Sequence, residues 1–278
     1  MVKCVVNGVS NTYDYNGNTY RRRSHAEAEV GAIIATAATT LLYEALPSFS
    51  NPFLKQMTKE HKNNSLYKDS FIKAVKDSGL KEKGLKLVHT ELSPYEMSIP
   101  AKDVINYDVK RGLNAFFNPG TKEIVLNCDK ASISGFHELG HAMNNMSGRF
   151  GKILQKLRAP GYALAGLMGT VALFTRPKPK DAPRNAFDWV QDHAAGLAVL
   201  GMLPTVAEEA LASHKGIKMA KSVGMSEDVI KNLKKFYGKA LLSYAGYAFV
   251  TGLSVYAVSK IMEIFTRPEK IESRRNYY

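Results

Sequence analysis

Charged residues are missing from four stretches of the chain, and these stretches dominate its hydrophobic pattern. The longest runs from Ala240 to Ser259, twenty uncharged residues between Lys239 and Lys260. At about 1.5 Å of rise per residue, twenty helical residues cover the roughly 30 Å hydrocarbon core of a bilayer. Flanking lysines and several tyrosines are typical of the ends of a membrane span. The stretch therefore predicts a transmembrane helix, with a buried helix of a soluble protein as the alternative.

The other three uncharged stretches are shorter. Residues 159–175 and 193–207 are seventeen and fifteen residues long, and residues 30–43 form a run of fourteen mostly small side chains. Only the first of these reaches the short limit for spanning a bilayer, and the second contains Pro204. We therefore expect two to four hydrophobic helices, and an integral, multi-pass membrane protein in contact with lipid.

The strongest globular pattern lies in residues 47–158. Apolar side chains at helical spacing predict a helix over residues 65–78, and alternating patterns predict short strands. A capped helix is then expected to begin at Asp129 or Ser132 and to continue to Asn145. The predicted strands cover residues 85–89, 113–117 and 123–127, the last two joined by an Asn-Pro-Gly turn.

Composition excludes several classes of protein. The 278 residues include 45% hydrophobic and 23% charged side chains, which excludes a disordered chain. Two cysteines, Cys4 and Cys128, exclude a disulfide scaffold and a cysteine-rich metal site. The net charge of +13 comes from lysines scattered over most polar stretches, without a basic recognition helix, so we expect no nucleic-acid partner.

The predicted helix after Asp129 contains the sequence His137-Glu138-Leu139-Gly140-His141, which has the pattern HExxH. Four residues advance a helix by slightly more than one turn, so both imidazoles emerge from one face and can bind one zinc ion. Glu138 lies beside the open position of the metal, where it can take a proton from bound water. A helix with two solvated histidines is the alternative.

A catalytic zinc site usually has three protein ligands, so a third must come from elsewhere. The four residues after His141 do not continue into the HExxHxxGxxH pattern. Glu208 and Glu209 follow the third apolar stretch and stand beside small residues, which would let a second helix approach the first. By spacing alone, these residues are equally typical of a zinc ligand and of a solvated acidic helix start.

Three segments together resemble a known group of peptidases. The order Asn114-Ala115-Phe116-Phe117-Asn118-Pro119-Gly120, Ile124-Val125-Leu126 and then HELGH resembles gluzincin membrane peptidases of the HtpX type and bacterial neutral zinc metallopeptidases. Those families place the third ligand in an ExxA(D/S) motif on a later helix, and Glu209 to Ser213 fits ExxAS. The resemblance covers residues 110–146 and 203–215, a minority of the chain.

The resemblance implies one zinc ion per chain, bound by His137, His141 and Glu209, with Glu138 as catalytic base. Glu208 is the alternative third ligand. It also implies that the strand Asn114, Ala115, Phe116 and Phe117 is the edge that pairs with an extended substrate. Ser213 stands where the families usually have an acidic residue, so the group that supports a zinc histidine differs here.

These patterns predict a mainly α-helical α+β chain with a zincin-like catalytic core, a small β-hairpin or sheet and two to four hydrophobic helices. If residues 159–175 and 193–207 form a hairpin through the membrane, HELGH and Glu209 return to the same side. The expected segments are a polar lead with a marginal hydrophobic helix (1–46), the catalytic segment (47–158), the hydrophobic hairpin with a basic loop (159–207), the third-ligand region (208–239), and a transmembrane helix with a basic tail (240–278).

We therefore expect a membrane-bound zinc endopeptidase that acts on a peptide or membrane-protein substrate. Two alternatives stay open: a multi-spanning scaffold or binding protein whose HExxH binds no metal, and a soluble helical zinc hydrolase. The residue that stabilises the oxyanion is not assigned, and its candidates are His193, His214, Tyr237 and Tyr244.

Overall fold

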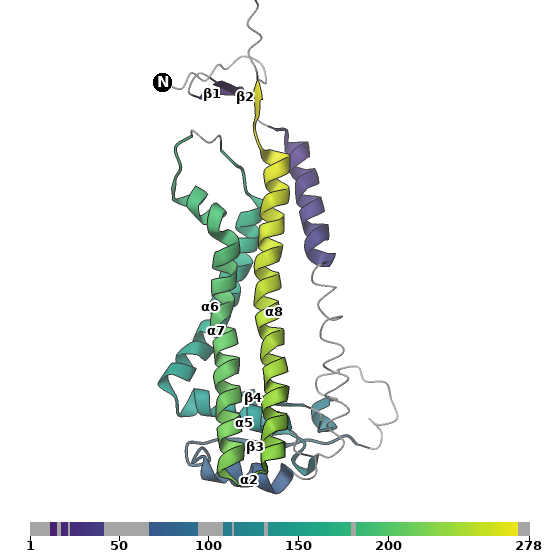
Figure 1. Cartoon of the computed structure of the whole chain (residues 1–278), viewed down its shortest axis with the longest axis vertical. Helices are drawn as coiled ribbons and strands as arrows, with labels where there is room; N and C mark the ends of the chain where they lie inside the picture. The colour runs from purple at the N-terminus through teal and green to yellow at the C-terminus, as the bar shows by residue number, and fades with distance from the viewer. Residues whose placement is uncertain are drawn as a thin grey trace, which may run out of the picture. The chain divides into compact units, whose positions relative to one another are not determined.

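The structure is a computed structural model that describes residues 12–15, 18–21, 23–41, 67–93, 108–112, 114–130, 133–178 and 182–271. The expectation of a mainly helical chain with small sheets is confirmed (Figure 1). Two units divide the chain: unit 1 holds residues 1–46, 162–202 and 247–278, and unit 2 holds residues 47–161 and 203–246. The second and third apolar stretches therefore lie mostly in unit 1, whereas HELGH and Glu209 both lie in unit 2.

Unit 2 contains a three-stranded sheet in the order β3-β5-β4, built from Lys86–His89, Glu123–Leu126 and Ala115–Asn118. Strands β3 and β5 are parallel, and β4 pairs with β5 in antiparallel register. The predicted hairpin is thus present, with Lys122 in the left-handed region at φ 58°. Within the described residues, β4 pairs with β5 alone and so forms an edge of the sheet.

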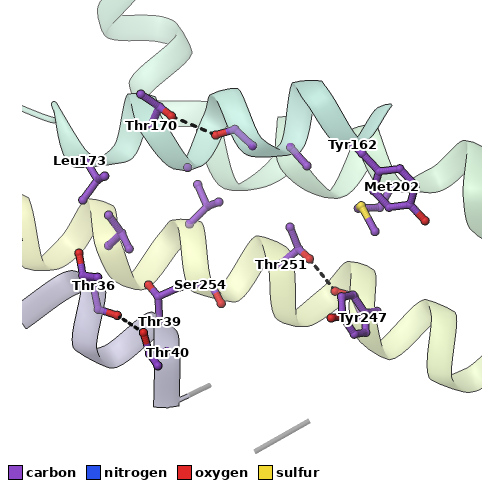
Figure 2. A pocket seen from close by; sticks show the side chains of 15 residues that line it. Thr36, Thr39, Thr40, Tyr162, Thr170, Leu173, Met202, Tyr247, Thr251 and Ser254 are labelled. Atoms are coloured by element: carbon purple, nitrogen blue, oxygen red, sulfur yellow. Dashed lines mark hydrogen bonds between the residues drawn. The ribbon is translucent and has the colours of Figure 1, made fainter. Parts of the chain in front are cut away.

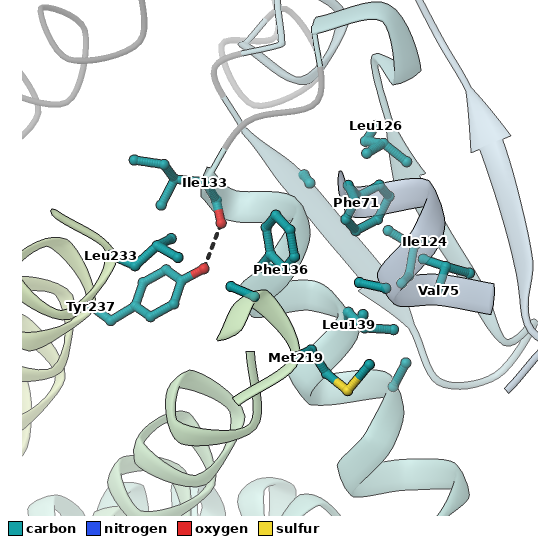
Figure 3. Close-up of a cluster of buried hydrophobic side chains, with 14 of the residues drawn as sticks. Phe71, Val75, Ile124, Leu126, Ile133, Phe136, Leu139, Met219, Leu233 and Tyr237 are labelled. Atoms are coloured by element: carbon teal, nitrogen blue, oxygen red, sulfur yellow. Dashed lines mark hydrogen bonds between the residues drawn. The ribbon is translucent and has the colours of Figure 1, made fainter. Parts of the chain in front are cut away.

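Two helices pack on this sheet in unit 2. Helix α2 spans Lys68–Asp77, and Gly79 follows it at φ +63°. Residue 65, where the predicted helix begins, lies outside the described residues. Helix α5 spans Ile133–Met146 and carries HELGH. Its Phe136 meets Phe71 of α2 edge to face at 5.6 Å, in the centre of the apolar cluster that Figure 3 shows. This core fixes α5 against the sheet.

Three long helices contribute to both units. Helix α6 spans Arg149–Leu173, α7 spans Ala186–Ser222 and α8 spans Glu227–Thr266. Pro204 lies inside α7, so the third apolar stretch and the expected third-ligand region form one continuous helix. Helix α7 ends before Gly224, which has φ +81° and separates it from α8. The polar segment 208–239 is therefore split between two helices.

In unit 1, residues 25–41 are helical and pack beside α8, where Gly31 faces Phe265. Hydrogen bonds also join the other helices of this unit: Gln191 of α7 donates to the Phe174 carbonyl at 3.0 Å, and Thr266 of α8 donates to the Thr175 carbonyl at 2.9 Å. A small antiparallel sheet has the order β1-β2-β6 and consists of Thr12–Tyr15, Asn18–Arg21 and Glu269–Ile271.

A cavity of about 540 Å³ opens between residues 25–41, α6 and α8 in unit 1 (Figure 2). Hydroxyl side chains line much of it, yet most of them bond within their own helix. Thr36, Thr39 and Thr251 each donate to the carbonyl four residues earlier, at 2.8 to 2.9 Å. These hydroxyl groups are therefore already hydrogen-bonded within their own helices.

Two helices, α7 and α8, are long and apolar enough to cross a membrane by length and composition. Their most apolar stretches are 39% and 33% buried in the structure. Among the described helices, residues 25–41 and α6 do not pass the same test. The described residues therefore contain two candidate spans, the smallest number expected from the sequence.

Candidate metal centre

Helices α5 and α7 of unit 2 approach each other closely because two glycines face the opposite backbone. A Cβ built on Gly140 would lie 2.0 Å from the carbonyl oxygen of Ala212, and one built on Gly216 would lie 2.4 Å from that of Phe136. These pairs are one helical turn apart on antiparallel helices. One turn further along, the Asn144 amide meets the Glu208 carbonyl at 3.3 Å. The glycines thus set the register that brings Glu208 and Glu209 to the histidines.

Three ligand atoms converge where the helices meet. The Nε2 atoms of His137 and His141 are 3.0 Å apart, and Oε2 of Glu209 lies 3.0 Å from the first and 3.4 Å from the second. The rings stand edge to face with centroids 4.5 Å apart. All three groups are largely buried, since their side chains are 14%, 10% and 4% exposed. The structure therefore brings together the three residues that the sequence singled out as ligands.

The opposite ring nitrogens have their own partners. Nδ1 of His141 lies 2.9 Å from Oε1 of Glu208, and Nδ1 of His137 lies 3.2 Å from the hydroxyl of Ser213. An ionised carboxylate only accepts, so Nδ1 of His141 carries a hydrogen, and in the neutral ring that leaves the Nε2 lone pair directed at the convergence point. Glu208 contacts the far nitrogen of His141 rather than facing the convergence point, and the Ser213 hydroxyl contacts the far nitrogen of His137.

Glu208 is fully buried and accepts three further hydrogen bonds. Its Oε1 accepts from Asn144 at 2.9 Å and Gln155 at 2.8 Å, and its Oε2 accepts from Arg158 at 3.0 Å. Gln155 and Arg158 lie on one face of α6, with Gly151 one turn earlier packed on Asn144. Four donors hold this carboxylate ionised and fixed, as a buried charge requires.

Glu138 lies beside the convergence point and is held by the edge strand. Its Oε2 accepts the backbone N–H of Phe117 at 2.8 Å, and its carboxylate lies within 4.8 Å of the ring nitrogens of His137 and His141. Burial raises the pKa of the Glu138 carboxyl, although both histidines and the Phe117 N–H act in the opposite direction. A carboxylate with a raised pKa is better suited to accept and release a proton near neutral pH.

The donor set fits a zinc ion. Zinc–ligand distances of about 2.0–2.2 Å in a tetrahedron place ligand atoms about 3.3–3.6 Å apart, and the observed sides are 3.0, 3.0 and 3.4 Å. A divalent cation together with Arg158 would also balance the three carboxylates. Burial alone would lower the pKa of His141, but Glu138, Glu208 and Glu209 raise it to about 10.

Of the four oxyanion candidates, Tyr244 lies in unit 2 and interacts electrostatically with Glu209, Arg158 and Glu138. Tyr237 packs against the His137 ring at 5.2 Å, but its hydroxyl donates to the Ile133 carbonyl at 2.6 Å. His214 is exposed. His193 belongs to unit 1, where it stacks on Trp189.

The remaining sequence predictions concern the edge strand. Asn114 precedes β4 and its side chain accepts the Ala115 N–H at 2.9 Å. With the Phe117 N–H bound to Glu138, the N–H groups of both Ala115 and Phe117 are engaged. Phe116 is exposed.

Sequence reasoning missed the residues that surround Glu208, namely Asn144, Gln155 and Arg158. The only sequence signal for Arg158 is its place directly before the apolar stretch 159–175, where arginine is typical of an interfacial anchor. No known protein family, curated protein or solved structure matches this chain, so its function is argued from this site alone.

Proposed function

We propose that this chain is a membrane-bound zinc-dependent endopeptidase with a gluzincin-like site in unit 2. One observation carries the proposal: Nε2 of His137, Nε2 of His141 and Oε2 of Glu209 form a triangle with sides of 3.0 to 3.4 Å, with the Glu138 carboxylate beside it. In this proposal, His137, His141 and Glu209 are the zinc ligands and Glu138 is the catalytic base. Glu208 acts as the support of His141.

The residues of the chain divide the work of hydrolysis. When bound, zinc supplies a water molecule of lowered pKa and polarises the scissile carbonyl. Glu138 would accept a proton from the attacking water and return it to the leaving amine, and the Phe117 N–H keeps its carboxylate in place. Tyr244 is the candidate donor to the oxyanion.

A zincin-like core is supported by the order of elements around the site. The edge strand β4, the strand β5 and the active-site helix α5 follow one another along the chain. Phe117 of β4 donates a hydrogen bond to Glu138 of α5, the proposed catalytic base. An extended peptide would pair along the open edge of β4. Because the N–H groups of Ala115 and Phe117 are engaged, the substrate would donate to the carbonyl oxygens of this edge rather than accept from it.

Membrane location is supported by the unequal cores of the two units. The largest fully buried side chains, including Phe71, Phe136 and Leu80, all lie in unit 2. Buried apolar residues of unit 1 are mostly alanine, valine and methionine, whereas large apolar side chains such as Leu167 and Phe249 are exposed. Small residues between helices and large ones outside are typical of a helix bundle in lipid.

The decisive test of the enzyme is a comparison of detergent-purified wild-type protein with Glu138→Gln. Wild-type protein should contain about one zinc per chain and cleave an unfolded protein substrate. Glu138→Gln should keep the zinc and lose cleavage, because it removes the base and leaves the ligands. The proposal is wrong if the purified wild-type protein binds no zinc, or if Glu138→Gln retains full activity.

Membrane location is tested separately. We expect the chain to stay in the membrane fraction after carbonate extraction. Release into the supernatant together with bound zinc would instead support a soluble helical zinc hydrolase, and membrane retention without any zinc would support a scaffold.

A further inference from the structure

Arg158 joins the two adjacent glutamates of the metal centre. Its NH1 lies 3.0 Å from Oε2 of Glu208, and its NH2 lies 3.2 Å from Oε1 of Glu209. The Arg158 side chain is 31% exposed, whereas the side chains of Glu208 and Glu209 are 0% and 4% exposed. A side chain of α6 thus reaches two buried carboxylates of α7 with its planar fork.

The contact with Arg158 gives the two oxygens of Glu209 different roles. Oε2 faces Nε2 of both His137 and His141, at 3.0 and 3.4 Å. Oε1 is turned toward Arg158 at 3.2 Å. A carboxylate that bound zinc through both oxygens would occupy the position that a catalytic water needs.

We infer that Arg158 is a positioning residue that makes Glu209 a ligand through one oxygen and so keeps a coordination position open for water. The inference rests on the proposed zinc site. The same guanidinium holds Glu208, which fixes the ring of His141, so one side chain sets the orientation of two of the three ligands. Without it, two neighbouring buried carboxylates would repel each other and rotate apart.

Arginine is suited to this role in a way that lysine is not. Its guanidinium offers parallel N–H donors from different nitrogens, whereas an ammonium is a single point of charge on a flexible stem. Arg158→Lys would keep the positive charge but could not hold both carboxylates in the observed geometry. Charge and geometry can therefore be separated by experiment.

The test compares Arg158→Met and Arg158→Lys with Lys156→Met in the detergent-purified full chain. Lys156 lies two residues away on the same helix and is exposed, so its replacement removes a positive charge without touching the carboxylates. Zinc affinity is measured by competition with a chelator. Coordination is read from the visible absorption of the cobalt(II)-substituted protein, which is stronger for four ligands than for five or six.

We expect Arg158→Met to lose about 10- to 100-fold in metal affinity and to show weaker cobalt absorption, because Glu209 then binds through both oxygens. Arg158→Lys should recover part of the affinity but keep the altered spectrum, and Lys156→Met should match wild-type protein. Should Arg158→Met not fold, the spectrum of Arg158→Lys decides alone.

Three results would overturn the inference, and they differ in whether the proposed zinc site also fails. If the wild-type protein binds metal and both Arg158 variants keep its affinity and cobalt spectrum, Arg158 has no positioning role and the zinc site stands. If the wild-type protein binds no metal, the proposed function fails and this inference fails with it. A fall in thermal stability with an unchanged spectrum would also contradict it, since that indicates a structural role.

Discussion

Replacing Gly140 by alanine tests whether the close contact of α5 and α7 builds the metal centre. The added Cβ would lie 2.0 Å from the Ala212 carbonyl oxygen, and Cβ atoms essentially never approach closer than 3.0 Å, so the helices must separate by about 1 Å. Metal sites tolerate errors of about 0.2 Å in ligand distance. Gly140→Ala should therefore reduce zinc affinity by on the order of 100-fold and destabilise the protein by about 1–3 kcal/mol.

The matched control is Gly238→Ala in helix α8 of the same unit. A Cβ at Gly238 meets nothing within 4 Å, so the only expected effect is a gain of about 0.5–1 kcal/mol from helix propensity. Gly216→Ala provides a graded case, because its Cβ would lie 2.4 Å from the Phe136 carbonyl and needs a separation of only about 0.6 Å. Its loss of zinc affinity should fall between the other two.

Zinc affinity is measured by chelator competition, and stability by denaturant unfolding of the metal-free protein. If Gly140→Ala bound zinc as tightly as wild-type protein, the ligand geometry would not depend on the contact between the two backbones. Equal losses in Gly140→Ala and Gly238→Ala would likewise refute the reasoning, because only one of the two glycines is packed.

Three further predictions concern the surroundings of the ligands. Ser213→Ala removes the hydroxyl at 3.2 Å from Nδ1 of His137 and should lower zinc affinity about tenfold in the same chelator competition. Tyr237→Phe leaves the Ile133 carbonyl without its 2.6 Å partner and should cost about 1–2 kcal/mol of unfolding free energy while zinc affinity stays the same; a selective loss of zinc would contradict this. Zinc at about a thousand times its dissociation constant should raise the unfolding free energy by about 4 kcal/mol in wild-type protein, and thermal unfolding should show no such rise in His141→Ala.

Local patterns in the sequence predicted the elements around the site. The pattern HExxH, the Asn-Pro-Gly turn and the alternating strands each depend on neighbours within one turn or one hairpin, and the structure contains α5, β4 and β5 at these places. Boundaries differ by a few residues. The continuity of α7 through Pro204 was not predicted, because an isolated proline is a helix-breaking signal that tertiary packing can override.

The roles of the two adjacent glutamates required the structure. Neighbouring residues on a helix differ by about 100° in direction. Glu208 and Glu209 both reach α5, but because of this difference they contact different nitrogen atoms of its histidines. The role of Arg158 could not be found from the sequence, since its partners lie about fifty residues later. An arginine at the start of an apolar stretch is also typical of an interfacial anchor. Long-range packing decides such roles.

The threonines around the unit 1 cavity affect how its helices score on hydropathy scales. Such scales count each hydroxyl as polar, whether or not it is already bonded. Thr36, Thr39 and Thr40 donate to carbonyls of their own helix, and so does Thr170 of α6. For a neighbouring hydrocarbon, these residues therefore act much like valines. Hydropathy scales therefore underestimate how compatible residues 25–41 and α6 are with a hydrocarbon environment.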